Sequence, residues 1–105
     1  MNTKRKSSAI KYLESLRKGP LTFGQLLHSI RLADEISQAQ IADMVGMSRS
    51  HICDIEKDCR TVSIERAAQF AEALGYSKNQ FVAAVIDDQL REAGLPFVVE
   101  LKKAA

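Results

Sequence analysis

The chain has 105 residues, of which 46% are hydrophobic, so it is long enough to bury the core of one domain without disulfides. It has no tryptophan, five glycines and two prolines, which favours a soluble, mostly helical fold, and no apolar run approaches the roughly 20 residues of a membrane span. The N-terminal sequence MNTKRKSS lacks the apolar segment of a secretory signal, so we expect a cytoplasmic protein that makes no membrane contact.

The formal net charge of +2 is spread unevenly along the chain. Residues 1–20 carry six basic residues and one acidic residue, whereas residues 21–75 carry five basic and eight acidic residues, and residues 76–105 balance to zero. A domain with this charge has modest non-specific affinity for the phosphates of nucleic acids. Any nucleic-acid binding therefore depends on where a few cations lie.

The basic segment 1–20 is predicted to comprise an arm and a short N-terminal helix. The arm, residues 1–6, has no apolar periodicity and carries Lys4, Arg5 and Lys6. These cations either follow a DNA groove or form a solvated tail, and the sequence leaves both alternatives open. Residues 8–18 have apolar side chains at helical spacing before a Gly-Pro pair, which predicts the helix; it packs either on the domain or on a second subunit.

A longer helix is predicted to begin after Thr22. The side chain of Thr22 can accept a hydrogen bond from the backbone of Gln25, and the side chain of Gln25 can reach back to Thr22, which is a capping box. Helical spacing predicts that its buried stripe comprises Phe23, Leu26, Leu27, Ile30 and Ala33.

Two short helical patterns joined by a turn occupy residues 38–57. Ser37 begins a second capping box, and Ser48 is placed to cap the second pattern. Each pattern has one apolar face, made by Ile41, Val45, Met47, Ile52 and Ile55. Ala42 is small where two crossing helices come closest, and Gly46 can take the positive φ of a tight turn. A plain helical hairpin would not require these features together, so we predict a helix-turn-helix.

The run from Gln38 to Lys57 resembles the DNA-reading unit of the Cro and lambda-repressor (XRE) family of bacterial and phage regulators, and the similarity extends over about residues 21–85. The resemblance implies an all-α fold in which residues 21–93 form a five-helix, lambda-repressor-like helix-turn-helix domain. It also implies binding to double-stranded DNA without a cofactor.

Specific DNA contacts follow from the resemblance. The second helix of the motif would present Arg49, Ser50 and Asp54 to base edges in the major groove. Asp54 either accepts from N4 of cytosine, or serves to exclude wrong sequences, or orients Arg49. Contacts to the DNA backbone would come from Gln38, Ser48, Lys57 and Arg60, while His51 lies over either a phosphate or a base.

A structural ion pair between Arg31 and Glu56 is also implied by the resemblance. A guanidinium and a carboxylate between the first and third helices of the motif's domain would be partly desolvated and would neutralise each other. The alternative is two exposed charges that never meet.

The region after the helix-turn-helix is predicted to contain two more helices. Asp58 stands in a loop at a positive-φ position, where the family commonly places glycine or asparagine. Ser63 would cap the fourth helix and Ser77, with Gln80, would form a capping box for the fifth. The inward positions predicted for the fourth helix are Ile64, Ala67, Ala68, Phe70, Ala71 and Leu74.

The C-terminal segment 94–105 changes character to β-branched and aromatic residues, which predicts a short β-strand. Its apolar side chains are Phe97, Val98, Val99 and Leu101. A lone strand needs an edge to pair with, so the tail either pairs with a second copy as a dimerisation tail, adds to a partner protein, or frays.

Two cysteines, Cys53 and Cys59, lie near His51 in an H-x-C-x5-C arrangement. A zinc site would need a fourth ligand and closer spacing of the cysteines, so we expect no metal. In a reducing compartment two ordinary thiols are favoured over a redox switch.

The function predicted from the sequence is a sequence-specific transcriptional regulator, a repressor that binds a palindromic operator as a homodimer. One alternative is an antitoxin that neutralises a toxin protein and represses its own operon. Another is a protein-interaction module, because residues 21–75 are acidic overall. An enzyme is not expected, because no nucleophile with a base, metal set or phosphate-binding glycine loop is recognisable.

Overall fold

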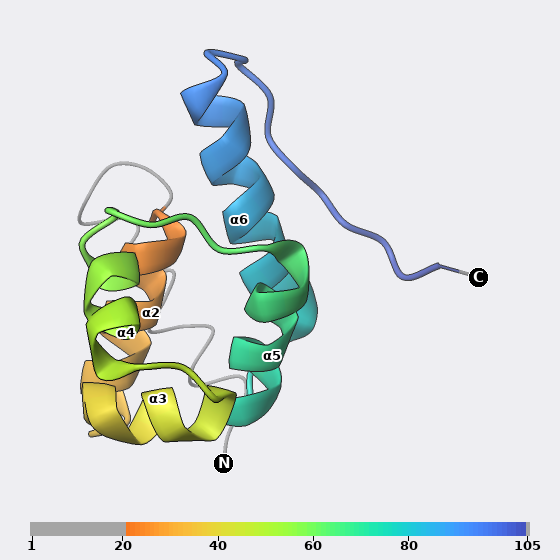
Figure 1. Ribbon diagram of the computed structural model, residues 1–105. Coiled ribbons are helices and arrows are strands. Elements are labelled where there is room, and N and C mark those ends of the chain that lie inside the picture. The colour runs from red at the N-terminus through yellow and green to blue at the C-terminus, as the bar shows by residue number, and fades with distance from the viewer. Residues whose placement is uncertain (1–20, 105) are drawn as a thin grey trace.

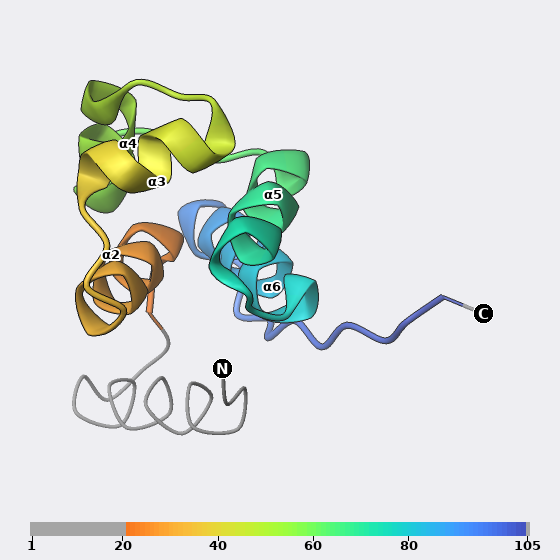
Figure 2. The same cartoon turned by 90° about the horizontal axis from the view of Figure 1, so that it is seen from below.

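The computed structural model describes residues 21–104, and these residues form an all-α domain with no strand. Its five helices are α2 (Phe23–Ala33), α3 (Gln38–Val45), α4 (Arg49–Glu56), α5 (Ile64–Leu74) and α6 (Lys78–Glu92). Figure 2 shows α5 and α6 together on one side of the domain, with α2, α3 and α4 grouped on the other. The arm and short helix predicted for residues 1–20 lie outside the described residues. None of the five helices is long and apolar enough to cross a membrane.

The helix starts follow from local hydrogen bonds at the caps. Thr22 and Ser37 form the predicted capping boxes, and the Ser48 side chain accepts from the backbone N–H of His51. The capping box predicted at Ser77 is wrong, because its side chain makes no capping hydrogen bond. Ser77 has a ψ of 129°, whereas the four serine and threonine caps that do bond have values between 153° and 162°.

The core lies between the two groups of helices and has an aromatic centre. The ring of Phe23 packs on Phe70 and Phe81 at centroid distances of 5.7 and 5.9 Å, which joins α2 to α5 and α6. The other fully buried large side chains are Leu27, Ile41, Ile52 and Ile55. Ala33 and Ile64, predicted to face inward, are exposed, since they lie in the last and first turns of their helices.

The turn between α3 and α4 depends on Gly46, which has a left-handed conformation with φ 70°. This conformation lets the chain reverse while the N–H of Met47 bonds to the carbonyl of Ala42 at 2.9 Å. Asp58 has φ 60°, so the positive φ predicted after α4 is confirmed. The left-handed conformation of Glu35 (φ 55°), before α3, was not predicted, because glutamate has no special preference for it.

The strand predicted in the C-terminal tail is wrong for the described chain. Residues 95–104 leave α6 as an extended segment with no strand pairing (Figure 1). Two of its backbone N–H groups bond to α6: that of Leu95 donates to the carbonyl of Leu90 at 2.9 Å, and that of Val99 donates to Oδ1 of Asp87 at 3.2 Å. An all-helical domain offers no strand edge, so the alternating apolar pattern of the tail has nothing to pair with inside one chain.

Candidate nucleic-acid interface

Helix α4 is anchored by one face and presents the other to solvent. Ile52 and Ile55 are 0% and 1% exposed and fix the helix against the core. Arg49 and Ser50, in its first turn, are exposed, and the side chain of Asp54 is 44% exposed one turn later. The three predicted base-contacting residues therefore lie on the accessible side of one helix, and its first turn is open to a major groove.

Asp54 and Arg60 lie close to each other. Nε of Arg60 donates to Oδ2 of Asp54 at 3.3 Å, and both side chains are about half exposed. An exposed pair of this kind contributes little to stability. It does restrain where the guanidinium of Arg60 lies, beside the outward face of α4. Among the described residues Arg49 has no such partner and keeps its donors free.

The predicted DNA-backbone contacts are spread around both helices of the motif. Ser48 caps α4 and the half-exposed His51 follows in its first turn, while Lys57 ends that helix and is exposed. Gln38 is the first residue of α3, where the Ser37 cap takes up the N–H of Gln40. The remaining N–H groups of such a helix start are suited to a phosphate oxygen.

The structure brings Arg31 and Glu56 together across the α2–α4 interface. Nε and Nη2 of Arg31 donate to the two carboxylate oxygens of Glu56 at 2.7 and 3.0 Å. A third donor atom, Nη1, bonds to the carbonyl of Ile36 at 3.0 Å, so the same side chain also holds the loop between α2 and α3. The side chains of Arg31 and Glu56 are 11% and 3% exposed.

Two further donors, which the sequence did not identify, reach the same carboxylate. Nδ1 of His28 lies 2.8 Å from Oε1 of Glu56, and Nε2 of Gln38 lies 3.3 Å from it. Burial by itself raises the pKa of Glu56, but hydrogen bonds from Arg31, His28 and Gln38 outweigh it and the pKa lies below its ordinary value. The hydrogen bond to Glu56 raises the pKa of Arg31 against the opposing effect of burial. Glu56 therefore links α2, α3 and α4 as an ion.

Arg66 provides a second unpredicted link. From α5, its Nη1 donates to the carbonyl of Val45, the last residue of α3, at 2.8 Å, and to Oε1 of Gln69 at 3.0 Å. A cation at the C-terminal end of a helix satisfies free carbonyls and complements the helix dipole. Arg66 thus fixes the end of α3 that leads into the turn.

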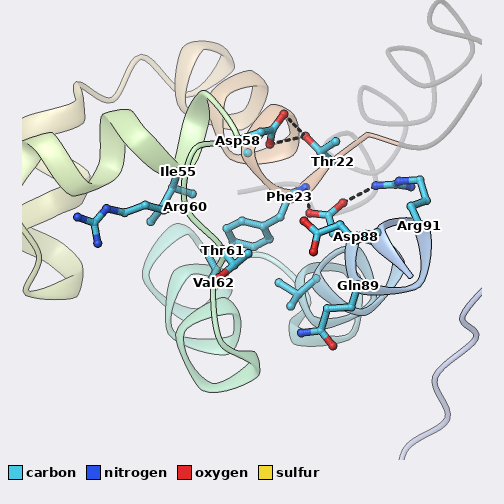
Figure 3. Close-up of a pocket in the computed structure, with 13 residues that line it drawn as sticks. Thr22, Phe23, Ile55, Asp58, Arg60, Thr61, Val62, Asp88, Gln89 and Arg91 are labelled. Carbon is cyan, nitrogen blue, oxygen red and sulfur yellow. Dashed lines mark hydrogen bonds and ion pairs between the residues drawn. The ribbon is translucent and has the colours of Figure 1, made fainter. Parts of the chain in front are cut away.

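A cavity of about 170 Å³ lies between the start of α2, the α4–α5 loop and α6 (Figure 3). Oγ1 of Thr22 donates to both carboxylate oxygens of Asp58, at 2.9 and 3.1 Å, and Oδ2 of Asp88 accepts from the N–H of Phe23 at 2.9 Å. Arg91 also bonds to Asp88. Burial raises the pKa of Asp88, against the lowering effect of these hydrogen bonds. Because these polar groups bond to one another, the cavity lining holds the start of α2 against the α4–α5 loop and α6.

The family model described as helix-turn-helix matches residues 27–81, which contain α3, α4 and the turn between them. The chain belongs to the helix-turn-helix family of the Cro and lambda-repressor (XRE) type. This is a family of DNA-binding transcriptional regulators, and α4 is the second helix of the motif in this chain. The fold class and the family predicted from the sequence are both confirmed.

Two curated relatives are regulators by their names. The chain is 32% identical over 69 residues to an immunity repressor protein of Bacillus phage phi105, a match that covers 66% of this chain and 45% of the relative. It is 38% identical over 56 residues to the control protein C.BamHI of Bacillus amyloliquefaciens, covering 52% of this chain and 69% of the relative. The helix-turn-helix chain thus spans less than half of the phage protein.

Proposed function

We propose that this helix-turn-helix protein represses transcription by binding a palindromic operator as a homodimer. The observation that carries the proposal is the outward face of α4, where Arg49 and Ser50 are exposed while Ile52 and Ile55 are buried behind them. Similarity to a phage immunity repressor supports repression as the outcome. A bound dimer would act by blocking access of polymerase to the DNA.

In this proposal the first turn of α4 reads the bases. Arg49 donates to O6 and N7 of a guanine, and Ser50 forms an adaptable hydrogen bond. Asp54 accepts from N4 of cytosine or excludes other bases. Its carboxylate also accepts from Arg60, so one of its oxygens is already engaged before DNA binds.

Backbone contacts would fix the register of α4 in the groove. Gln38 and the start of α3 bind one phosphate, and Ser48, His51, Lys57 and Arg60 bind others around α4. Lys4, Arg5 and Lys6, which lie outside the described residues, are proposed as an arm that follows the adjacent DNA. Deleting residues 1–6 would then flatten the salt dependence of binding, whereas an unchanged slope would exclude the arm.

The C-terminal tail, which pairs with no strand of its own chain, is proposed as the dimer surface. Phe97 and Val98 are 63% and 92% exposed, while Val99 and Leu101 are half-buried on the same segment. A helix-turn-helix of this size covers too few base pairs to be selective alone. Burying the apolar tails between two copies would bring two recognition helices onto one operator.

The same exposed tail also fits the antitoxin alternative, in which the apolar surface is covered by a toxin protein. The two occupants differ in what the purified chain does alone. A homodimer forms without any other protein, whereas an antitoxin tail stays exposed until its partner is added. The mass of the purified chain in solution, measured by sedimentation, therefore separates them.

The decisive experiment is selection of duplexes from a random-sequence library by the full-length chain. We expect an inverted repeat whose half-sites lie about one helical turn, ~34 Å, apart. A matched selection with the Arg49→Ala variant should lose one specified base in each half-site. Absence of any enriched duplex would refute DNA reading, and enrichment of one asymmetric half-site would refute the homodimer.

A further inference from the structure

One oxygen of a buried carboxylate accepts from three side chains on two helices. Oε1 of Glu56 lies 2.8 Å from Nδ1 of His28, 3.0 Å from Nη2 of Arg31 and 3.3 Å from Nε2 of Gln38. The side chains of Glu56 and Arg31 are almost covered, whereas that of His28 is 49% exposed. Glu56 therefore holds the His28 ring beside the Gln38 amide, at the surface where α3 begins.

The hydrogen bond to Glu56 fixes the tautomer of a neutral His28. An ionised carboxylate can only accept, so Nδ1 must carry the proton in this bond. The other ring nitrogen, Nε2, is then an acceptor and makes no hydrogen bond within residues 21–104. Since Nδ1 and Nε2 lie on different edges of the ring, Nε2 is turned away from Glu56. It can donate to an anion only after it also takes up a proton.

We propose that His28 is a further ligand of the DNA backbone, binding a phosphate in its doubly protonated form beside Gln38. The inference rests on the proposed function, in which the start of α3 lies against a phosphate. In the complex Nδ1–H donates to Glu56 and Nε2–H donates to a phosphate oxygen. The second proton comes from solution, so each protomer takes up one proton as it binds. Glu56 is a positioning residue for this contact.

The charged groups around the His28 ring couple the uptake of its second proton to the binding of DNA. The ring faces two opposite charges, the carboxylate of Glu56 on α4 at 2.8 Å and Nη2 of Arg31 on α2 at 3.3 Å from Nδ1. Gln38 on α3 is neutral. Because Arg31 already neutralises Glu56, an added phosphate provides the unbalanced negative charge that an imidazolium needs. The affinity should therefore rise as the pH falls through the range of about 5 to 8 in which histidine changes charge.

The test uses the full-length chain and a duplex enriched from the random library, with dissociation constants measured at about pH 6 and pH 8. The chain contains two histidines, so the His51→Gln variant leaves His28 as its only imidazole. In that variant we expect tighter binding at the lower pH, by at most about tenfold per pH unit for each proton taken up. The slope of log affinity against log salt should also be steeper by about 0.9 per protomer at the lower pH.

The double variant His28→Gln/His51→Gln is the matched comparison. Its glutamine still offers an amide to Glu56 but cannot change charge, so both pH effects should vanish. Thermal unfolding monitored by circular dichroism checks its fold. In the wild type, the Cε1–H resonance of His28 should titrate at higher pH with the duplex than without it, which tests the proposal without any substitution.

The inference would be overturned if the His51→Gln variant bound DNA with no dependence on pH. It would equally be overturned if the double variant kept the pH effects. An unmoved His28 titration on adding the duplex would do the same. In all three cases DNA binding itself remains, so the proposed function survives. If no duplex is enriched from the library, the proposed function is refuted, and the inference about His28 is refuted with it because no DNA phosphate is then bound.

Discussion

The guanidinium of Arg31 and the carboxylate of Glu56 form a two-bond ion pair that joins α2 to α4, with N–O distances of 2.7 and 3.0 Å. The third guanidinium nitrogen of Arg31, Nη1, donates to the carbonyl of Ile36 just before α3 begins. A single buried side chain thus sets the entry to α3 relative to the end of α4. The angle between the two helices of the DNA-binding motif depends on this pair.

Replacing Glu56 with glutamine should therefore destabilise the domain strongly. The change leaves the largely buried guanidinium of Arg31 without its counter-charge, which costs about 3–5 kcal/mol in comparable pairs. Urea unfolding at neutral pH measures the loss. Asp54→Asn, which breaks the exposed pair with Arg60, is the matched control and should cost no more than about 1 kcal/mol. Equal effects of the two substitutions would show that burial of the Arg31 pair has no energetic role.

The lowered pKa of Glu56 predicts the sign of one pH effect. Its folded pKa lies below the ordinary value of 4.5, so its stabilising effect is complete above that value and is lost as the pH falls through the folded pKa. The raised pKa of Asp88 acts in the opposite direction, because its contribution is present at low pH and is lost as pH rises. Asp88 contributes equally to the wild type and to Glu56→Gln, so its contribution cancels in the difference between their unfolding free energies. This difference should shrink below about pH 4.5, and a constant difference would contradict the assignment.

Gly24→Ala should destabilise the protein although alanine is the better helix former. Gly24 lies inside α2, where propensity alone predicts a gain of about 1 kcal/mol. A Cβ at this position would collide with the carbonyl oxygen of Ile55 and with Oδ1 of Asp58. Since the backbone of α4 cannot move aside without disturbing the recognition helix, we expect a loss of about 1–3 kcal/mol. Thermal and urea unfolding decide the sign, and a more stable variant would show that α2 and α4 do not touch here.

Two substitutions, one in the first turn of α4 and one at its C-cap, should separate base reading from backbone binding. Arg49→Ala should cost about 1–3 kcal/mol of affinity for the selected duplex and relax one base position. Lys57→Ala should weaken all duplexes alike and reduce the salt slope by about one per protomer. Dissociation constants for the selected duplex and for single-base variants of it, each measured at several salt concentrations, give the base preference and the salt slope. The reverse pattern would mean that Lys57 reads a base and that Arg49 binds the DNA backbone.

Much of this fold could be predicted because its signals are local. The start of α2 and the turn at Gly46 are specified within a few residues, through a capping box and a positive φ. Ser77 shows the limit of such signals, because its sequence matches a capping box but its side chain makes no capping bond. The prediction of a strand in the tail was wrong for a different reason. β-branched residues indicate extended backbone, but a strand also needs another strand to pair with elsewhere in the fold.

The candidate site was less predictable than the fold because its key contacts are long-range. His28 precedes Arg31 by one helical turn, so a shared face could be inferred from spacing. Convergence on Glu56 depends on how α2 crosses α4, which no local pattern specifies. The bond from Arg66 to the carbonyl of Val45 is of the same kind, since it joins residues 21 positions apart.

The exposed tail gives the final prediction, which concerns assembly. Val98 is 92% exposed in the single chain, so Val98→Asp cannot disturb the monomer core but would place a charge in an apolar dimer contact. We expect sedimentation to show a weaker dimer, and truncation after Gly94 to give a monomer. Glu100→Ala, a change at another exposed position on the same segment, should leave the mass unaltered. The truncated chain should also bind a single half-site but not the full palindrome with high affinity, because the two recognition helices are no longer linked. A truncated chain that still sediments as a dimer would move the dimer surface from the tail to the helices.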